Sequence, residues 1–367
     1  ELDRVLSGGI VGGSVTLLAG EPGIGKSTLV AQIAEAFKRK DSPAYYVSGE
    51  ESTGQLLMRL KRLKIEPENI SFSNTVAVPS VIAAAKKLRP SILIVDSIQT
   101  MAPDSDTLPG TPTAVRGSTA LCIEFAKSTG IPVLIIGQVT KDGNVAGPKT
   151  LEHLVDTVIT LEGDKDGTYR ILRANKHRFG STDEIGIFEM TEGGMIAVDN
   201  PSAKFLEERQ HMAGSVITCV MEGSRPILLE IQALAERSIY PNPVRRTSGF
   251  DSGRLQMLIA IISKRVGVEV NVQDIYVNVV GGMKVKETAM DLAVCCAIIS
   301  SVKDKAMSDK TVIFGELGLG GEIRKVPHQD RRIKEAKRLG YSNIISPKNA
   351  KQLKDLKPPR AQLVALD

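Results

Sequence analysis

The sequence predicts an α/β domain built on a parallel sheet, followed by a smaller α+β domain. In the first half, short apolar runs alternate with helical patterns, which is typical of a parallel sheet covered by helices on both faces. One apolar run leads directly into a glycine-rich loop. The alternation stops near Asp199–Pro201, where strand patterns begin to follow one another. We therefore expect one domain over residues 1–200 and a second over residues 201–367.

The first domain should contain a regular series of elements. Buried strands are expected at Ser14–Ala19, Ala44–Ser48, Ile92–Val95 and Pro132–Ile136. Helices are expected at Ser27–Lys40, Thr53–Leu63, Ser80–Leu88 and Ala114–Ser128. Three more strand patterns follow without helices between them, at Asp156–Leu161, Tyr169–Arg173 and Ile185–Glu189. They predict an antiparallel extension at one edge of the sheet.

The second domain has a different pattern. Two strands, Ser215–Met221 and Pro226–Ala235, are expected to pair through the turn at residues 222–225. The remaining elements should be helices at Gly253–Arg265, Lys286–Ser301 and Gln329–Leu339, and strands at Asp274–Val280 and Thr311–Glu316.

Composition narrows the class of protein. Of 367 residues, 42% are hydrophobic and 24% charged, which excludes collagen-like, disordered and membrane-spanning chains. The net charge of +5 permits a nucleic-acid partner without implying one. Aromatic residues make up 4% and tryptophan is absent, so base stacking is an unfavourable main binding mode. Three basic clusters are expected to be solvated: Lys38-Arg39-Lys40, Arg245-Arg246 and Arg331-Arg332.

The four cysteines contain no CxxC pair, so a zinc ribbon or redox motif is not expected. We expect Cys295 and Cys296 to be buried thiols because they lie in the apolar run Ala293–Ile299. Free buried thiols favour a reducing, cytoplasmic location.

The glycine-rich loop carries the strongest chemical signal. It fits the pattern G-x-x-x-x-G-K-[ST], with a strand before it and a helix after it. Backbone amides in such a loop surround phosphate oxygens, the lysine reaches the β- and γ-phosphates, and the hydroxyl binds Mg²⁺. The expected ATP or ADP ligands are Gly20, Glu21, Pro22, Gly23, Ile24, Gly25, Lys26, Ser27 and Thr28.

Acidic and polar residues end the neighbouring strands. Asp96 follows a buried strand and is expected to hold Mg²⁺ together with Ser27. Glu50 is expected to polarise the attacking water, with Glu51 as a helper or helix cap. Gln138 could contact the γ-phosphate, although a polar residue without that role is also compatible with the sequence.

These motifs, with Leu2–Ile10 and Val47–Ser52, resemble the RecA- and KaiC-like ATPases. Three further stretches narrow the resemblance to the bacterial DNA repair family called RadA or Sms: residues 137–143, residues 146–153 and the motif Lys176-His177-Arg178-Phe179-Gly180. Three positions depart from that family: Gln138 replaces a histidine, His177 replaces an asparagine, and Gly117 stands where an acidic residue is common. Members normally begin with a four-cysteine zinc finger, which this sequence lacks, so zinc is expected only in a module outside it.

The resemblance implies a ring-shaped, hexameric DNA-dependent ATPase. Such proteins act as helicases or branch-migration motors on single-stranded and branched DNA, alongside the recombinase RecA. It further implies that Lys176 or Arg178 reaches a neighbouring subunit's γ-phosphate, or else the DNA backbone. Two glycine- and proline-rich loops are expected to contact DNA phosphates through Arg116, Lys141 and Lys149.

The second domain resembles the proteolytic domain of Lon proteases in residues 314–327. That family uses a Ser–Lys dyad, but Ala289 or Met290 occupies the serine position here. Without a nucleophile the domain cannot form an acyl-enzyme, so a non-proteolytic scaffold is expected. Two alternatives to the motor stay open: a filament-forming recombinase of the RecA type and a KaiC-like signalling ATPase.

Overall fold

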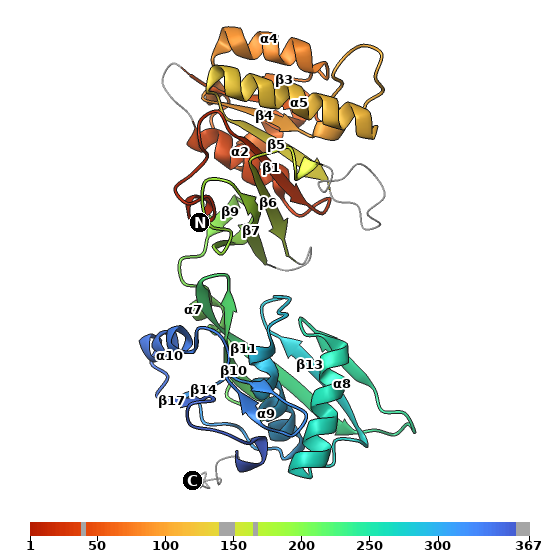
Figure 1. The fold of residues 1–367 in the computed structure, drawn as a ribbon, viewed down its shortest axis with the longest axis vertical. Helices are drawn as coiled ribbons and strands as arrows, with labels where there is room; N and C mark the ends of the chain where they lie inside the picture. The colour runs from red at the N-terminus through yellow and green to blue at the C-terminus, as the bar shows by residue number, and fades with distance from the viewer. Residues whose placement is uncertain (38–41, 139–150, 164–167, 357–367) are drawn as a thin grey trace. The chain divides into compact units, whose positions relative to one another are not determined.

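The computed structural model describes residues 1–37, 42–138, 151–163 and 168–356. The chain divides into two compact units, Glu1–Asp199 and Asn200–Asp367, each with its own large sheet (Figure 1). In the described part of the chain, no helix combines the length and apolar character needed to cross a bilayer.

The first unit is built on a nine-stranded sheet of order β3-β2-β4-β5-β1-β6-β7-β8-β9. Its parallel part consists of β1 (Val15–Gly20), β2 (Ala44–Ser48), β3 (Ile70–Ser73), β4 (Ile92–Asp96), β5 (Val133–Gln138) and β6 (Thr157–Glu162). The antiparallel part consists of β7 (Tyr169–His177), β8 (Ile185–Thr191) and β9 (Gly194–Ala197). The predicted α/β class is therefore confirmed.

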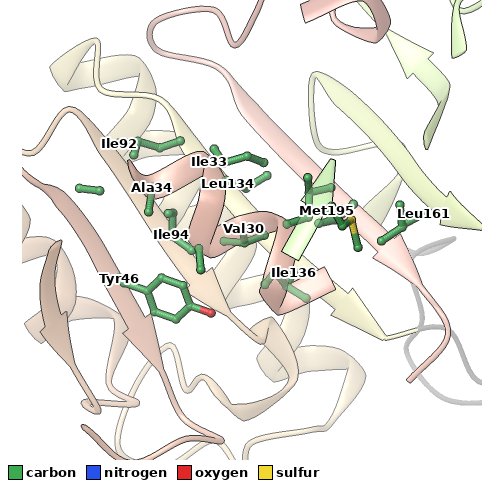
Figure 2. Packing of buried hydrophobic residues seen from close by; sticks show 14 of the residues in the cluster. Val30, Ile33, Ala34, Tyr46, Ile92, Ile94, Leu134, Ile136, Leu161 and Met195 are labelled. Atoms are coloured by element: carbon green, nitrogen blue, oxygen red, sulfur yellow. The ribbon is translucent and has the colours of Figure 1, made fainter. Parts of the chain in front are cut away.

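Helices cover both faces of this sheet because its buried strands alternate their side chains between two cores. Besides the short α1 (Leu2–Val5), the helices are α2 (Lys26–Ala36), α3 (Thr53–Arg62), α4 (Val78–Leu88) and α5 (Pro112–Thr129). Apolar residues of α2 and α3 share one cluster, and those of α4 and α5 share the other. Strand β4 shows the alternation, with Ile94 in the first cluster and Leu93 in the second. Figure 2 shows Ile94 next to the ring of Tyr46 in the first cluster.

Three features of the first sheet differ from the sequence prediction. Strands β3 and β9 were not predicted, because four-residue strands carry too little periodicity. Strand β6 was expected to belong to the antiparallel extension, but it pairs parallel with β1. Its other edge pairs antiparallel with β7, so the change of direction falls after β6.

The second unit contains a six-stranded sheet of order β12-β13-β11-β10-β14-β17. Its strands are β10 (Ser215–Glu222), β11 (Arg225–Arg237), β12 (Arg245–Ser248), β13 (Gln273–Val279), β14 (Thr311–Ile313) and β17 (Asn343–Ile345). A separate ribbon joins β15 (Glu316–Leu317) and β16 (Ile323–Arg324). The helices are α7 (Pro201–Phe205), α8 (Ser252–Ile261), α9 (Asp291–Val302) and α10 (Gln329–Arg338). The predicted pairing of β10 with β11 is confirmed.

Two expectations for the second unit were wrong. Helix α9 begins at Asp291 rather than Lys286, because Glu287 is extended and binds the guanidinium of Arg332. The basic pair Arg331-Arg332 is not a solvated cluster. Arg332 is fully buried, donates to the carbonyl oxygens of Cys219 and Pro327, and lies over the ring of Phe314. The expected burial of Cys295 and Cys296 is confirmed; Cys122 and Cys219 are buried as well, and all four thiols are free.

Candidate nucleotide site

The phosphate-binding loop lies between the end of β1 at Gly20 and the start of α2 at Lys26. Gly25 is the residue before the helix, and its φ of 111° is unfavourable for a residue with a side chain. A Cβ at this position would collide with the methyl ends of Met190 and Met195. Because the ends of these flexible side chains can move aside, the backbone conformation is the main reason for glycine at position 25.

Two cations lie close to the loop backbone. The Lys26 ammonium is almost fully buried and donates to the carbonyl oxygens of Gly20 and Glu21, each at 2.9 Å. Arg170 of β7 is also buried, and its Nε donates to the Ile24 carbonyl at 2.9 Å. Because Ile24 lies inside the loop, Arg170 fixes the loop from the antiparallel part of the sheet.

Asp96 ends β4 on the same side as the loop and is nearly buried. One carboxylate oxygen accepts a hydrogen bond of 2.5 Å from the Tyr46 hydroxyl. Burial raises the pKa of Asp96, while hydrogen bonds from Tyr46 and Ser27 act in the opposite direction. A carboxylate beside a serine hydroxyl supplies the oxygen ligands that Mg²⁺ prefers. Ser27 and Asp96 therefore fit the magnesium role expected of them.

Glu50 follows β2 and faces the same cavity. Its Oε1 accepts hydrogen bonds from the Ser97 hydroxyl at 2.5 Å and from the Gln138 side-chain amide at 3.0 Å. Gln138, which ends β5, is thus brought to the carboxylate that the sequence assigns to the attacking water. The two carboxylates are therefore held separately, so Asp96 is available to a cation and Glu50 fits the proton-transfer role expected of it.

The expectation that Glu51 could cap a helix was wrong. Helix α3 is capped by Ser52. The Ser52 hydroxyl accepts a hydrogen bond from the backbone N–H of Gln55, and the side-chain oxygen of Gln55 accepts one from the backbone N–H of Ser52. Glu51 instead forms a bidentate ion pair with Arg59 of α3. Because Arg59 lines the cavity, this ion pair holds one of the cavity's lining side chains in place.

The cavity has a volume of about 340 Å³. It is lined by Pro22, Gly23, Gly25, Lys26, Ser27, Thr28, Glu50, Arg59, Asp96, Ile136 and Gln138. A second cavity of about 420 Å³ shares Thr28 with it and extends along Arg62 and residues 190–194. The first cavity offers polar groups for a triphosphate, and the second offers mainly apolar surface beside the start of α2.

The two cations of the motif at residues 176–180 have different surroundings. The Lys176 ammonium donates to the carbonyls of Glu152 at 2.7 Å, Val155 at 2.8 Å and His153 at 3.4 Å. The side chain of Arg178 is 53% exposed and forms an ion pair of 3.5 Å with Asp156. Lys176 is therefore tied to its own chain, whereas the guanidinium of Arg178 is largely solvent-accessible.

Of the residues expected to bind DNA outside this motif, only Arg116 is described; Lys141 and Lys149 lie outside the described residues. Arg116 was expected at the end of the loop Pro103–Arg116, which overlaps the predicted helix Ala114–Ser128. The structure places it in the helix, on the exposed side of α5, which begins at Pro112 with Thr111 as its cap. Proline at the first helical position and a capping threonine explain why the helix starts before the predicted Ala114.

In the second unit, Ala289 and Met290, the two candidates for the expected serine position, are both fully buried apolar side chains. The neighbouring Thr288 donates to the Glu316 carboxylate at 3.2 Å. The second unit also has a cavity of about 900 Å³ along β11, β12 and β13. Its lining mixes Met212, Leu234 and Tyr276 with polar groups and does not include the glycine-rich loop, so we do not assign the nucleotide to it.

Four residues of the first unit were missed by the sequence analysis: Tyr46, Arg59, Ser97 and Arg170. Ser97 could have been noticed because it follows Asp96 directly. Tyr46 lies in a strand that reads as wholly apolar, and nothing in the local sequence indicates the partner of its hydroxyl. Arg59 and Arg170 contact residues 8 and 146 positions away.

Models of two protein families match parts of this chain, and the first of these matches contains the phosphate loop. Residues 1–83 match the model of the KaiC ATPase family, and residues 254–350 match that of the ChlI subunit of Mg-chelatase. Among solved structures, the RadB recombinase is 22% identical, with a TM-score of 0.43 over 54% of this chain and 96% of its own. A KaiC-like protein from Pyrococcus horikoshii is 19% identical, with a TM-score of 0.43 over 53% of this chain and 94% of its own.

Curated relatives extend the likeness along both units. The DNA repair protein RadA of Aquifex aeolicus is 46% identical over 95% of this chain and 78% of its own length. RadA of Pseudomonas aeruginosa is 44% identical over 95% of this chain and 77% of its own. RadA of Streptococcus pneumoniae is 47% identical over 95% of this chain and 84% of its own.

Proposed function

Because this chain belongs to the RadA family of DNA repair proteins, which are RecA-like ATPases, we propose that it is an ATP-driven motor on DNA. It would form a ring, hexameric in its simplest version, and drive helicase or branch-migration steps on single-stranded and branched DNA beside RecA. The observation that carries the proposal is the convergence of Lys26, Asp96 and Glu50 on one cavity beside the phosphate loop.

Lys26, the pair Ser27 and Asp96, and Glu50 would have separate tasks in hydrolysis. The buried Lys26 ammonium stabilises negative charge on the β- and γ-phosphates. Ser27 and Asp96 would hold Mg²⁺, which when bound neutralises charge on the phosphate oxygens. Glu50 orients the attacking water and accepts its proton. The Ser97 and Gln138 hydrogen bonds fix the carboxylate oxygen that faces them.

Gln138 offers a route from the nucleotide to DNA. It donates to Glu50 and is followed directly by the glycine-rich segment that contains Lys141 and Lys149. A DNA phosphate bound by that segment would act on the chain next to Gln138, and thereby on Glu50. We infer that DNA binding and hydrolysis are coupled through this hydrogen bond, with Arg116 as a further phosphate contact.

Arg178 is the better candidate for a residue that acts on a neighbouring subunit's γ-phosphate. Its side chain is 53% exposed, and its ion pair in the described part of the chain is one contact of 3.5 Å to the largely buried carboxylate of Asp156. Lys176 would have to leave three carbonyl oxygens of its own chain. We therefore assign the arginine finger to Arg178 and an anchoring role to Lys176.

We assign the second unit a non-proteolytic scaffolding role in ring assembly. Neither Ala289 nor Met290 offers a nucleophile at the expected serine position, and the hydroxyl of Thr288 donates to the Glu316 carboxylate. Peptidase activity that disappears in Thr288→Ala would contradict this assignment.

The decisive experiment measures ATP hydrolysis with and without single-stranded DNA, with Lys26→Ala as the inactive control. We expect hydrolysis that rises with DNA and is absent from the control. An ATP hydrolysis rate that does not change when DNA is added would favour the KaiC-like signalling alternative. Electron micrographs showing helical filaments instead of closed rings would favour the recombinase alternative.

A further inference from the structure

Two hydroxyl groups cross between the strands that carry the two carboxylates. Strands β2 and β4 are parallel neighbours, with Ser48 opposite Asp96. Tyr46 on β2 donates to Asp96, which ends β4, at 2.5 Å. Ser97, directly after β4, donates to Glu50, which follows β2, also at 2.5 Å. Each carboxylate is therefore held by a hydroxyl from the other strand.

Both hydroxyls are held rigidly by their surroundings. Tyr46 is fully buried, and its ring lies in the apolar cluster with Ile94 (Figure 2). Ser97 is also fully buried. A ring packed on all sides cannot swing, so the Tyr46 oxygen occupies one position relative to Asp96. A buried donor of this kind orients a ligand that would otherwise rotate about its side-chain bonds.

We propose that Tyr46 and Ser97 are positioning residues with separate effects, Tyr46 orienting Asp96 for Mg²⁺ and Ser97 orienting Glu50 for the attacking water. The proposal rests on the proposed ATP hydrolysis at this cavity. If the two hydroxyls only stabilised the fold, removing either would lower stability in the same way. As positioning groups, each should change a different property of the site when it is removed.

The first test is Tyr46→Phe, with Tyr45→Phe as its matched control. Tyr45 is the preceding residue of β2, is also buried, and belongs to the cluster on the opposite face of the sheet. Mg²⁺ is titrated while the affinity of the protein for a fluorescent ATP analogue is measured, in the first seconds before turnover. The readout is the Mg²⁺ concentration that gives half of the full increase in this affinity, and a sample with EDTA is the metal-free reference. We expect Tyr46→Phe to raise this concentration about tenfold, the lower end of the usual effect of removing a partner of a metal ligand. Tyr45→Phe should leave it unchanged.

The second test is Ser97→Ala. We expect its kcat at saturating Mg²⁺ and ATP to fall about tenfold, part of the ~10²- to 10⁴-fold effect of a positioned general base. Its half-saturating Mg²⁺ concentration should equal that of the wild type. For Tyr46→Phe, kcat at saturating Mg²⁺ should recover to near the wild-type value.

Several results would overturn the proposal. Equal Mg²⁺ dependence in Tyr46→Phe and Tyr45→Phe would remove the role of Tyr46. Loss of metal-free nucleotide binding or of thermal stability in either test variant would mean that its hydroxyl has a structural role only. A wild-type chain that binds the analogue with Mg²⁺ but never hydrolyses ATP would refute the proposed function, while the Mg²⁺ titration of Tyr46→Phe would still decide the role of Tyr46.

Discussion

Replacing Lys176 with methionine separates anchoring from catalysis at the motif of residues 176–180. Methionine keeps most of the aliphatic stem and removes the ammonium. The substitution deletes three hydrogen bonds to the carbonyls of residues 152, 153 and 155. These carbonyls belong to the segment that leads into β6, so their loss should loosen the start of that strand.

The size of the effect follows from the geometry. A hydrogen bond to a charged group contributes about 1.5–3 kcal/mol, and two of the three bonds are shorter than 3 Å. The group is partly exposed, so water replaces some of what is lost. Burial and the nearby Arg178 also lower the pKa of Lys176, which shows that holding its charge there has a cost. We therefore expect a loss of about 2 kcal/mol, equivalent to roughly 4–8 °C in a unit of this size.

The assay compares Lys176→Met with Arg178→Ala by thermal unfolding and by DNA-stimulated hydrolysis. Lys176→Met should lower the melting temperature of the first unit. Arg178→Ala should lower it less, because Arg178 makes one long contact of 3.5 Å from a half-exposed side chain and Asp156 keeps its hydrogen bond from the Val15 amide, yet it should reduce hydrolysis by about 10³-fold or more. Unchanged stability together with abolished hydrolysis in Lys176→Met would refute the anchoring role and return the finger to Lys176.

Three further outcomes are expected. Glu50→Gln should lower kcat by about 10²- to 10⁴-fold without weakening nucleotide binding, because the amide oxygen still accepts from Ser97 and Gln138; a single-turnover assay beside an equilibrium binding assay checks both. Gly25→Ala should destabilise the first unit by about 1–3 kcal/mol through its positive φ, and calorimetry with and without ATP would show the lost ligand stabilisation as well. Burial raises the pKa of Cys122 to about 12, so iodoacetamide at pH 8 should label this thiol only after unfolding, as mass spectrometry of native and denatured samples would show.

The elements that sequence reasoning predicted well are those whose signal is local. The phosphate loop is one continuous pattern, and its strand and helix flanks are adjacent in sequence. The strand β4 run ends in Asp96, and parallel strands bring their carboxyl ends to one edge, so the meeting of Asp96 with the loop follows from topology alone. The pairing of β10 with β11 is equally local because a short turn joins them.

Other features depend on partners far away in sequence. Arg332 looks like one half of a surface basic pair, but Glu287 lies 45 positions before it and makes its burial favourable. The direction of β6 is set by the edge of β1 that remains free, which a pattern of apolar residues does not reveal. Short strands such as β3 form only because β2 offers an unpaired edge.

The same distinction explains why the sequence identifies the groups that react but not those that orient them. A carboxylate at a strand end is conspicuous because an ionised side chain is costly to bury and so indicates chemistry. A tyrosine in an apolar strand is ordinary, and its hydroxyl acquires meaning only when the register of β2 and β4 sets it beside Asp96. Shifting that register by one residue would turn Tyr46 to the opposite face of the sheet and leave a buried carboxylate without its donor. The orienting hydroxyls therefore depend on the correct pairing of β2 with β4, so the site can be complete only when this part of the sheet has formed.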